Sequence, residues 1–284
     1  MKTQTIPMRV QKKDKEIVIA ATSDLHGCLE GIRQVCDDNK VDILIIAGDI
    51  QPADIQYHCN DTACCHWFRN KFFNLIKKLK CEVVAIPGNH DFWLRSFIHG
   101  NFGTPEERKE KFFIPDNFHL LAESEVTIKG LRIYGTPWVP WISGHWCFEA
   151  EEKELVWKWK QIPEGIDILV THTPPRYDNH NIDVSLERDQ NAHRHFGSYS
   201  LADRIREVNP SLVFCGHIHS GDHKCHVEYN KDKHHGNFVW NVSRVNERYF
   251  IGYPIRVVRF GEKTVIEREK DSLALCRGSN PLGC

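Results

Sequence analysis

The sequence of 284 residues lacks an apolar run near the roughly 20 residues that a membrane-spanning helix needs. Residues 1–16 are polar and lysine-rich without an apolar centre, so they do not resemble a secretory signal. The last residue is Cys284, and no cysteine stands fourth from the end, where prenylation requires one. Internal repeats and low-complexity tracts are also missing. From these absences we expect no membrane association and a cytoplasmic location.

The sequence also has no excess of either charge. It carries 37 lysines and arginines against 38 aspartates and glutamates, for a net charge of −1. A dedicated duplex-DNA binder usually has a basic surface, so nothing here gives a strong nucleic-acid-binding signal. The balance also disfavours a nuclease that acts on long polymers. We therefore expect the partner to be a small substrate held at a local site.

Cysteine is abundant, and the total of 11 is odd. Without a secretory signal, such cysteines are usually reduced and buried. A dense group of cysteines and histidines lies at residues 58–66, and it comprises His58, Cys59, Cys64, Cys65 and His66. The group could hold an additional zinc ion, but two adjacent cysteines fit poorly around one tetrahedral ion. A reduced, partly buried segment is the favoured interpretation.

Metal-binding residue types occur in five short blocks, each placed where an apolar run ends. The runs read as buried parallel strands at residues 17–21, 41–47, 82–86, 168–170 and 212–215. The blocks are Asp24-Leu25-His26, Gly48-Asp49, Gly88-Asn89-His90-Asp91, Thr171-His172 and Gly216-His217-Ile218-His219. Because the carboxyl ends of strands in an open α/β sheet face one crevice, we expect these blocks to meet at one site.

The spacing within the blocks supports a metal site. Asp24 and His26 are two residues apart, so they project to the same side of an extended strand end, and His217 and His219 repeat this pattern. The carboxylate of Asp49 has two oxygens and can bridge two ions. The glycines of the blocks allow sharp turns and close backbone approach. Two aspartates, an asparagine and several histidines suit two adjacent divalent cations.

In this order the blocks resemble the signature of the calcineurin-like metallophosphoesterases, which reads D-x-H, G-D, G-N-H-D, a lone H and G-H-x-H. The resemblance extends from Asp24 to His219. The residues after Asp49 depart from the Asp-Arg-Gly of phosphoprotein phosphatases, and Asp91 replaces a glutamate. Residues 134–140, 146–148 and 197–201 are similar to the metallophosphoesterase-domain-containing (MPPED) branch.

This resemblance implies an α/β fold of two mixed β-sheets packed as a sandwich and flanked by helices. It implies hydrolysis of phosphodiesters, with nucleotides or cyclic nucleotides as substrates, by two divalent metal ions (Mn, Fe or Zn) and no other cofactor. The metal ligands carried over from the family motif are Asp24, His26, Asp49 and His219 for one ion and Asp49, Asn89, His172 and His217 for the other. Two such cations bind phosphate oxygens and make a bound water acidic.

Two residues of the third block have other expected roles. Because Asn89 already supplies the ligand of this turn, we expect His90 to face the leaving-group oxygen as a catalytic acid. Asp91 is expected to orient the ring of His90, and it could equally serve as a helix N-cap. Phosphomonoesterase, phosphoprotein phosphatase and nuclease activities stay open. A non-catalytic scaffold of the same fold is disfavoured because every ligand position is intact.

All five blocks must reach one site, so we expect a single domain over residues 1–284, with a core at about 16–268 between polar tails. Further predicted helices cover residues 29–39, 64–80, 149–161 and 201–208, the third with Leu155 and Trp157 facing inward. Further predicted strands cover residues 118–121, 126–134, 223–229, 238–242, 255–260 and 264–268, with a turn at Lys129-Gly130.

Two long polar segments follow ligand blocks, and we expect both to border the site. Residues 92–117 are predicted to be a loop with a short helix, and residues 173–197 a long loop. Such loops on a rigid scaffold commonly set specificity, and these should narrow the site to small substrates. A nucleobase could stack on an aromatic residue near the blocks. The candidates are Phe92, Trp93, Trp138 and Trp141, each of which could instead belong to the core.

Overall fold

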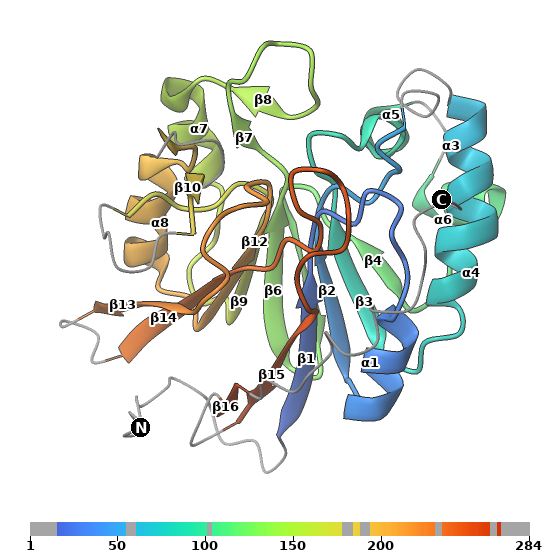
Figure 1. Cartoon of the computed structure of the whole chain (residues 1–284), viewed down its shortest axis with the longest axis horizontal. Helices are drawn as coiled ribbons and strands as arrows, with labels where there is room; N and C mark the ends of the chain where they lie inside the picture. The colour runs from blue at the N-terminus through green and yellow to red at the C-terminus, as the bar shows by residue number, and fades with distance from the viewer. Residues whose placement is uncertain are drawn as a thin grey trace.

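The computed structural model describes residues 16–54, 61–100, 104–177, 184–187, 194–230, 235–261 and 266–267. Two six-stranded mixed sheets face each other, and helices cover the outer face of each (Figure 1). The predicted sandwich flanked by helices is therefore confirmed. No helix in the described part of the chain is long and apolar enough to cross a membrane.

The first sheet carries the first three ligand blocks. Its strands, in sheet order, are β16 (Ile266–Glu267), β15 (Arg256–Phe260), β1 (Ile17–Thr22), β2 (Ile43–Ala47), β3 (Glu82–Ile86) and β4 (Phe118–Leu120). The four strands from β1 to β4 are parallel, and β15 pairs antiparallel with β1 and β16. The blocks after β1, β2 and β3 consequently leave the sheet at the same edge.

The second sheet carries the other two blocks. Its strands, in sheet order, are β13 (His226–Asn230), β14 (His235–Asn241), β12 (Leu212–Cys215), β9 (Ile168–Thr171), β6 (Leu131–Thr136) and β5 (Ser124–Ile128). The inner four are parallel. The predicted turn at Lys129 and Gly130 joins β5 and β6, and both residues have positive φ (50° and 76°), as tight hairpins require.

The strands of both sheets are apolar on both faces, because each sheet packs against the other sheet on its inner face and against helices on its outer face. Ile19 and Ile45 point between the sheets and pack in one buried cluster with Phe214 of the second sheet. Leu44 and Ile46 point to the other face, where helices cover them. This double burial explains why the sequence shows continuous apolar runs and not an alternating pattern.

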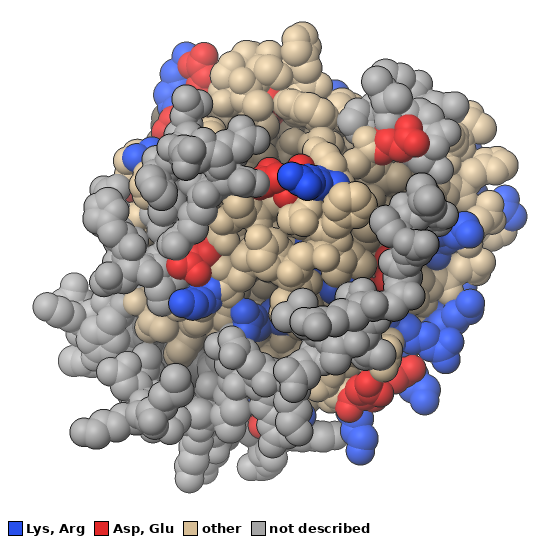
Figure 2. All heavy atoms as spheres, viewed as in Figure 1, with Lys and Arg blue, Asp and Glu red and all other residues tan. Residues whose placement is uncertain are grey.

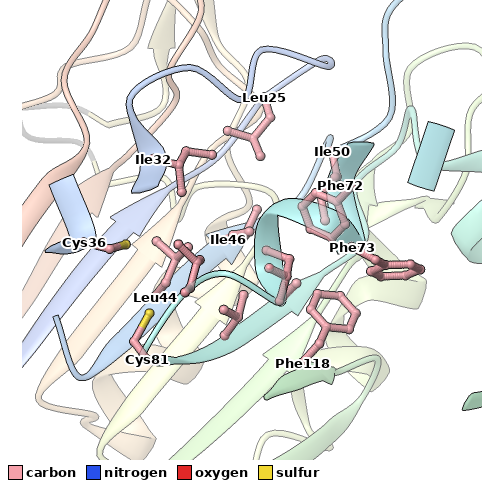
Figure 3. Close-up of a cluster of buried hydrophobic side chains, with 14 of the residues drawn as sticks. Leu25, Ile32, Cys36, Leu44, Ile46, Ile50, Phe72, Phe73, Cys81 and Phe118 are labelled. Carbon is pink, nitrogen blue, oxygen red and sulfur yellow. The ribbon is translucent and has the colours of Figure 1, made fainter. Parts of the chain in front are cut away.

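Helices on the outer face of the first sheet build a second cluster, rich in phenylalanine. They are α1 (Ile32–Asn39), α3 (Asp61–Trp67), the π-helical turn η1 (Phe68–Phe72), α4 (Phe73–Ile76), α5 (Phe92–His99) and α6 (Pro105–Phe112). Figure 3 shows Phe72 and Phe73 of this cluster beside Phe118. The helix predicted at residues 64–80 is thus present, interrupted by the π-helical turn.

Helices α7 (Glu152–Trp159) and α8 (Tyr199–Val208) cover the second sheet (Figure 1). The inward position predicted for Trp157 is wrong, since 66% of this residue is exposed. The buried side chains of α7 are Leu155 and Trp159. These two are four residues apart and share one helix face, whereas Trp157 lies about half a turn away from each of them.

Residues 92–117 are also more ordered than predicted. In place of a loop with a short helix they form two helices, α5 and α6. The start of α6 has a reciprocal cap, in which the Thr104 side chain accepts the N–H of Glu107 and the Glu107 carboxylate accepts the N–H of Thr104. Thr-Pro-Glu-Glu is a sequence signature of such a start, so this helix was readable from the sequence.

Two short two-stranded sheets complete the described fold. They pair β7 (Val139–Pro140) with β8 (Glu149–Ala150) and β10 (Leu186–Glu187) with β11 (Arg194–His195).

The five ligand blocks come from two sheets, three from the first and two from the second. The sheets are connected at this edge by backbone contacts beyond the strand ends. Ser23 forms an isolated parallel bridge with Ser243, which follows β14. The N–H of Ser23 donates to the carbonyl of Val242 at 2.8 Å, and the N–H of Arg244 donates to the carbonyl of Ser23 at 2.9 Å. The carboxyl ends of both parallel arrays are thereby held together.

Candidate metal centre

The carboxylate of Asp49 connects histidines of both sheets. Its Oδ2 lies 3.5 Å from Nε2 of His26, after β1, and 3.3 Å from Nε2 of His172, after β9. Its Oδ1 accepts the backbone N–H of His90 at 2.8 Å. Burial opposes ionisation of Asp49, but the nearby positive charges of His172 and His90 hold its pKa well below the usual range. The group is therefore an anion between two imidazoles.

Asp24 occupies the corresponding position beside the fifth block. Its Oδ1 lies 3.3 Å from Nε2 of His219, and its carboxylate accepts the N–H of His217 and the hydroxyl of Ser243, the latter at 2.8 Å. Burial again opposes ionisation, yet the hydrogen bond with His219 keeps the pKa of Asp24 below its ordinary value. Two buried carboxylates thus lie among four histidines.

Two of these histidines are oriented by backbone carbonyls. Nδ1 of His172 lies 2.8 Å from the carbonyl oxygen of Ala47, and Nδ1 of His219 lies 3.2 Å from that of Asn246. A carbonyl oxygen only accepts, so the hydrogen-bond network assigns a ring proton to Nδ1 and leaves Nε2 as the nitrogen that can take a second proton or bind a metal ion. Nε2 faces carboxylate oxygens, and in His172 it also lies 2.9 Å from Oδ1 of Asn89. Ring nitrogens and carboxylate oxygens that converge in this way suit a cation.

Burial keeps the other two histidines neutral. It lowers the pKa of His26 to about 3 and that of His217 to about 3, with the charge of His172 adding to the effect on His217. Among the described residues, neither ring nitrogen of His26 has a hydrogen-bond partner, although both are buried. A buried imidazole without a hydrogen bond is costly unless another group binds it, and neutral imidazole is the form that binds metals.

The pKa of His172 shifts in the opposite direction. Burial alone would lower it, but the carboxylate of Asp49 outweighs burial and raises the pKa of His172 to about 9. The pKa of His219 is also raised, because Asp24 outweighs burial. The pocket thus favours a positive charge next to its carboxylates, which a metal ion would supply in place of a proton.

Two groups of side chains have the geometry of a metal site. One contains Asp24, His26 and His219, and the other contains Asp24, Asp49 and His172, with the ligand atoms of each group within 4.8 Å of one another. Asp24 belongs to both groups, while Asp49 contacts a histidine of each. Asn89 and His217 adjoin the second group through His172, whose ring centroid is 5.2 Å from that of His217. The residues present therefore fit two neighbouring cations.

The backbone at this site is unusual, because four of the side chains come from residues in the left-handed region. The φ angles are 51° at Asp24, 43° at His26, 52° at Asp49 and 69° at His217. Residues other than glycine rarely adopt such angles, and strain of this kind gathers at functional sites. Backbone hydrogen bonds hold two of these residues in place. The N–H of Asp24 donates to the carbonyl oxygen of Gly48, and the N–H of His26 donates to the backbone carbonyl oxygen of Asp49, both at 2.9 Å.

The glycines of the blocks are required mainly by close packing. A Cβ on Gly88 would overlap Oδ1 of Asp49 and lie 2.7 Å from Cε1 of His172. A Cβ on Gly216 would overlap Oδ2 of Asp24. Gly48 combines both reasons, since its φ is +100° and a Cβ there would overlap His172. The close neighbours of these glycines are thus the site's own side chains.

The role predicted for Asp91 needs correction. Its carboxylate accepts backbone N–H groups from Ile50 at 3.0 Å, Gln51 at 2.8 Å and Gly88 at 2.7 Å, and it does not orient the ring of His90. Asp91 is the N-cap residue of α5, but its side chain makes no capping hydrogen bond. Burial and the charge of Asp49 raise the pKa of Asp91 to about 7. Its carboxylate joins the turn that carries Asp49 to the turn that carries Asn89.

The ring of His90 lies beside the ligand His26 and near two aromatic residues. Its ring centroid is 4.8 Å from that of His26, 4.3 Å from that of Trp146 and 6.5 Å from that of Tyr249. Tyr249 also contacts His26, at 4.7 Å between centroids. Tyr249 was not recognised in the sequence, because it lies in a loop more than 20 residues beyond the last block, without a motif of its own.

The aromatic candidates proposed from the sequence have different positions. Trp93 is a core residue stacked on Phe68 at 4.7 Å, and 58% of Trp141 is exposed. Trp138 packs partly buried beside the outer cluster of the second sheet. Phe92 is the one that approaches the site, 6.1 Å from Trp146.

The cysteine and histidine group at residues 58–66 lies partly outside the described residues, since 55–60 are not described. Cys64 is buried in the phenylalanine-rich cluster. The described part of this group contains no set of three ligands with metal-site geometry. Residues 178–183 and 188–193 of the long segment 173–197 also lie outside the described ranges, so its predicted place beside the site stays a prediction.

Comparison with known proteins agrees with this geometry. The family model for calcineurin-like phosphoesterases matches residues 17–221. Metallophosphoesterase domain-containing protein 1 from Homo sapiens is 32% identical over 215 residues, which cover 70% of this chain and 59% of that protein, and the Mus musculus protein matches equally. The chain thus spans less than two thirds of the length of these relatives. One solved structure superposes with a TM-score of 0.56 at 15% identity, covering 89% of this chain and 99% of that chain, which shows the fold alone.

Proposed function

Since the chain belongs to the calcineurin-like phosphoesterase family, we propose that it hydrolyses phosphodiester bonds of small substrates, such as nucleotides or cyclic nucleotides, with two divalent metal ions. The supporting observation is the position of Asp49, whose Oδ2 faces Nε2 of His26 and Nε2 of His172 at 3.5 and 3.3 Å. A carboxylate between two sets of ligands is what a bridged pair of cations requires.

The proposed ligands are those of the two expected sets. Asp24, His26, Asp49 and His219 would hold one ion, and Asp49, Asn89, His172 and His217 would hold the other. Nitrogen and oxygen ligands without thiolate suit Mn²⁺, Fe or Zn²⁺. When bound, the ions would neutralise phosphate oxygens and lower the pKa of a bound water toward about 7.

Hydrogen bonds to backbone carbonyls and to a side-chain hydroxyl orient the proposed ligands. The carbonyls of Ala47 and Asn246 orient His172 and His219, and the hydroxyl of Ser243 orients Asp24. Outer contacts of this kind usually change metal affinity or activity by about 10–100-fold when removed. Asp91 contributes through the backbone, since it keeps the turns of Asp49 and Asn89 in register.

His90 is the proposed catalytic acid. Its backbone N–H donates to Asp49, which fixes the residue beside the ligands, and its ring lies next to His26 and Trp146. An imidazole there can donate a proton to the departing oxygen of the ester. Asn89 is assigned as the ligand from this turn, so His90 is assigned to that step.

A phosphodiester assay tests the proposal. The metal-free protein, prepared with EDTA, is supplied with Mn²⁺ and assayed on bis(4-nitrophenyl) phosphate, cyclic nucleotides, 4-nitrophenyl phosphate and a phosphoprotein. We expect diesters to be hydrolysed fastest, and only with metal. The exposed variant Asp116→Asn, whose side chain is 98% exposed, is the matched control for Asp24→Asn. Fast phosphoprotein dephosphorylation without diester hydrolysis would replace the diesterase with a phosphatase.

Two further sequence predictions belong to this proposal. We propose that residues 1–284 form a single domain with its core at about 16–268, since the inner cluster combines residues from β1 to β15. The cytoplasmic location rests on the sequence alone.

A further inference from the structure

Two aromatic residues outside the ligand blocks lie near His90 of the third block. Trp146 comes from the segment between β7 and β8, and Tyr249 from the loop between β14 and β15. Their ring centroids are 4.3 and 6.5 Å from that of His90. Neither belongs to the buried core, because Trp146 is half-buried and Tyr249 is 42% exposed.

The segment of Trp146 is fixed to the ligand block itself. The N–H of Cys147 donates to the carbonyl of Asn89 at 3.0 Å, and the N–H of Val139 donates to the carbonyl of Phe148 at 2.9 Å. Cys147 and Phe148 are buried, so their side chains anchor this segment, while the indole of Trp146 stays partly exposed. The position of Trp146 relative to His90 is therefore set by the same turn that carries His90.

The loop of Tyr249 is fixed by Asn246. The Asn246 side-chain oxygen accepts the N–H groups of Arg248 at 2.9 Å and Phe250 at 3.2 Å, and its carbonyl accepts the N–H of Tyr249 at 2.8 Å. The same carbonyl orients His219. The loop is therefore built onto a ligand of the metal centre.

Tyr249 itself is held in the left-handed region, with φ of 60°. A bulky residue adopts this angle at a cost of roughly 1–3 kcal/mol, so its conformation needs a reason. The result of the conformation is that the ring packs edge-on against His26 and His219, at centroid distances of 4.7 and 5.7 Å, and keeps part of its surface in solvent. On this side of the molecule the mostly uncharged middle is interrupted by acidic and basic side chains where the β14–β15 loop crosses (Figure 2).

We propose that Trp146 and Tyr249 are specificity-determining residues that form two aromatic walls of the substrate site and select phosphoesters carrying a planar aromatic group. This inference rests on the proposed function, because it takes the phosphoryl group to bind at the metal centre. A planar ring attached to that group would extend past His90 along one or both walls. Aromatic side chains bind a flat aromatic group more tightly than a saturated ring of similar size, because only the flat group can stack on them.

Binding of two non-hydrolysable ligands tests the proposal. Phenylphosphonate and cyclohexylphosphonate share the same anionic head and differ in the planarity of a six-carbon ring. Their Kd values are measured by calorimetry on the Mn²⁺-loaded full chain, for the wild type, Trp146→Leu, Tyr249→Leu and Tyr249→Phe. Trp157→Leu serves as the control, since Trp157 is exposed on the solvent side of α7.

We expect the wild type to bind phenylphosphonate about three- to tenfold more tightly than cyclohexylphosphonate. The ratio should approach one in Trp146→Leu and Tyr249→Leu and stay at the wild-type value in Tyr249→Phe and Trp157→Leu. A wild-type ratio of one, a ratio unchanged in both leucine variants, or no binding of either phosphonate would overturn the proposal. Its failure differs from failure of the proposed function, which would appear as absent metal-dependent ester hydrolysis by the wild type, whatever the binding ratio.

Discussion

Gly88→Ala should disrupt the centre without removing any ligand. The new Cβ would overlap Oδ1 of Asp49 and lie 2.5 Å from its backbone nitrogen and 2.7 Å from Cε1 of His172. Asp49 is buried and held by the N–H of His90, so it cannot move away freely. Overpacking of this kind costs about 1–3 kcal/mol of folding free energy.

The larger effect should be on metal binding. Displacement of Asp49 disturbs both proposed ions, and we expect metal affinity to fall on the order of 100-fold. At a free Mn²⁺ concentration of about 100 times the wild-type Kd, metal stabilises the wild type by about 2.7 kcal/mol. With a Kd about 100-fold weaker, the same concentration would stabilise the variant by only about 0.4 kcal/mol.

Thermal unfolding with and without Mn²⁺ measures both effects. The metal-free Tm should fall for Gly88→Ala, and the rise in Tm caused by Mn²⁺ should nearly vanish. Gly261→Ala is the matched control, because among the described residues the nearest atom to its Cβ would be Cα of Glu16, at 3.6 Å. A Gly88→Ala protein that keeps the full wild-type rise in Tm with Mn²⁺ would refute the reasoning.

Three other outcomes follow from the same geometry. Asp49→Asn should reduce activity more than loss of any one other ligand, because both proposed ions depend on this carboxylate, and metal analysis should show a stoichiometry below two. His90→Ala should keep its metal but lose about 10²–10⁴-fold in turnover, with a smaller loss for nitrophenolate leaving groups, which need no proton; equal losses on good and poor leaving groups would contradict an acid role. Asp91→Ala should lower both metal affinity and Tm, because three buried N–H groups lose their acceptor, whereas Asp91→Asn should recover part of both; a wild-type metal affinity in Asp91→Ala would show that the two turns hold their register without it.

The parallel strands and the ligand blocks were readable because both are local patterns. The runs at residues 82–86 and 212–215 match β3 and β12 without a shift, since a proline or a glycine directly after each run leaves little choice of boundary. The turn at Lys129-Gly130 was recognised for the same reason. Trp157 was misassigned because Trp157 and Trp159 are both aromatic. Only the position of the sheet beneath α7 shows that Trp159, on the same face as Leu155, is the buried one.

By itself, the sequence determined which residue types can bind metal, where the strands that carry them end, and the family to which these blocks belong. Only the tertiary structure decided that the blocks come from two sheets, that Asp91 binds three backbone N–H groups, and that Tyr249 reaches the site from the loop after β14. The physical reason is how far apart in the sequence the interacting residues lie. Strand ends and turns depend on neighbouring residues, whereas hydrogen-bond partners about 40 residues apart depend on how the finished sheets pack.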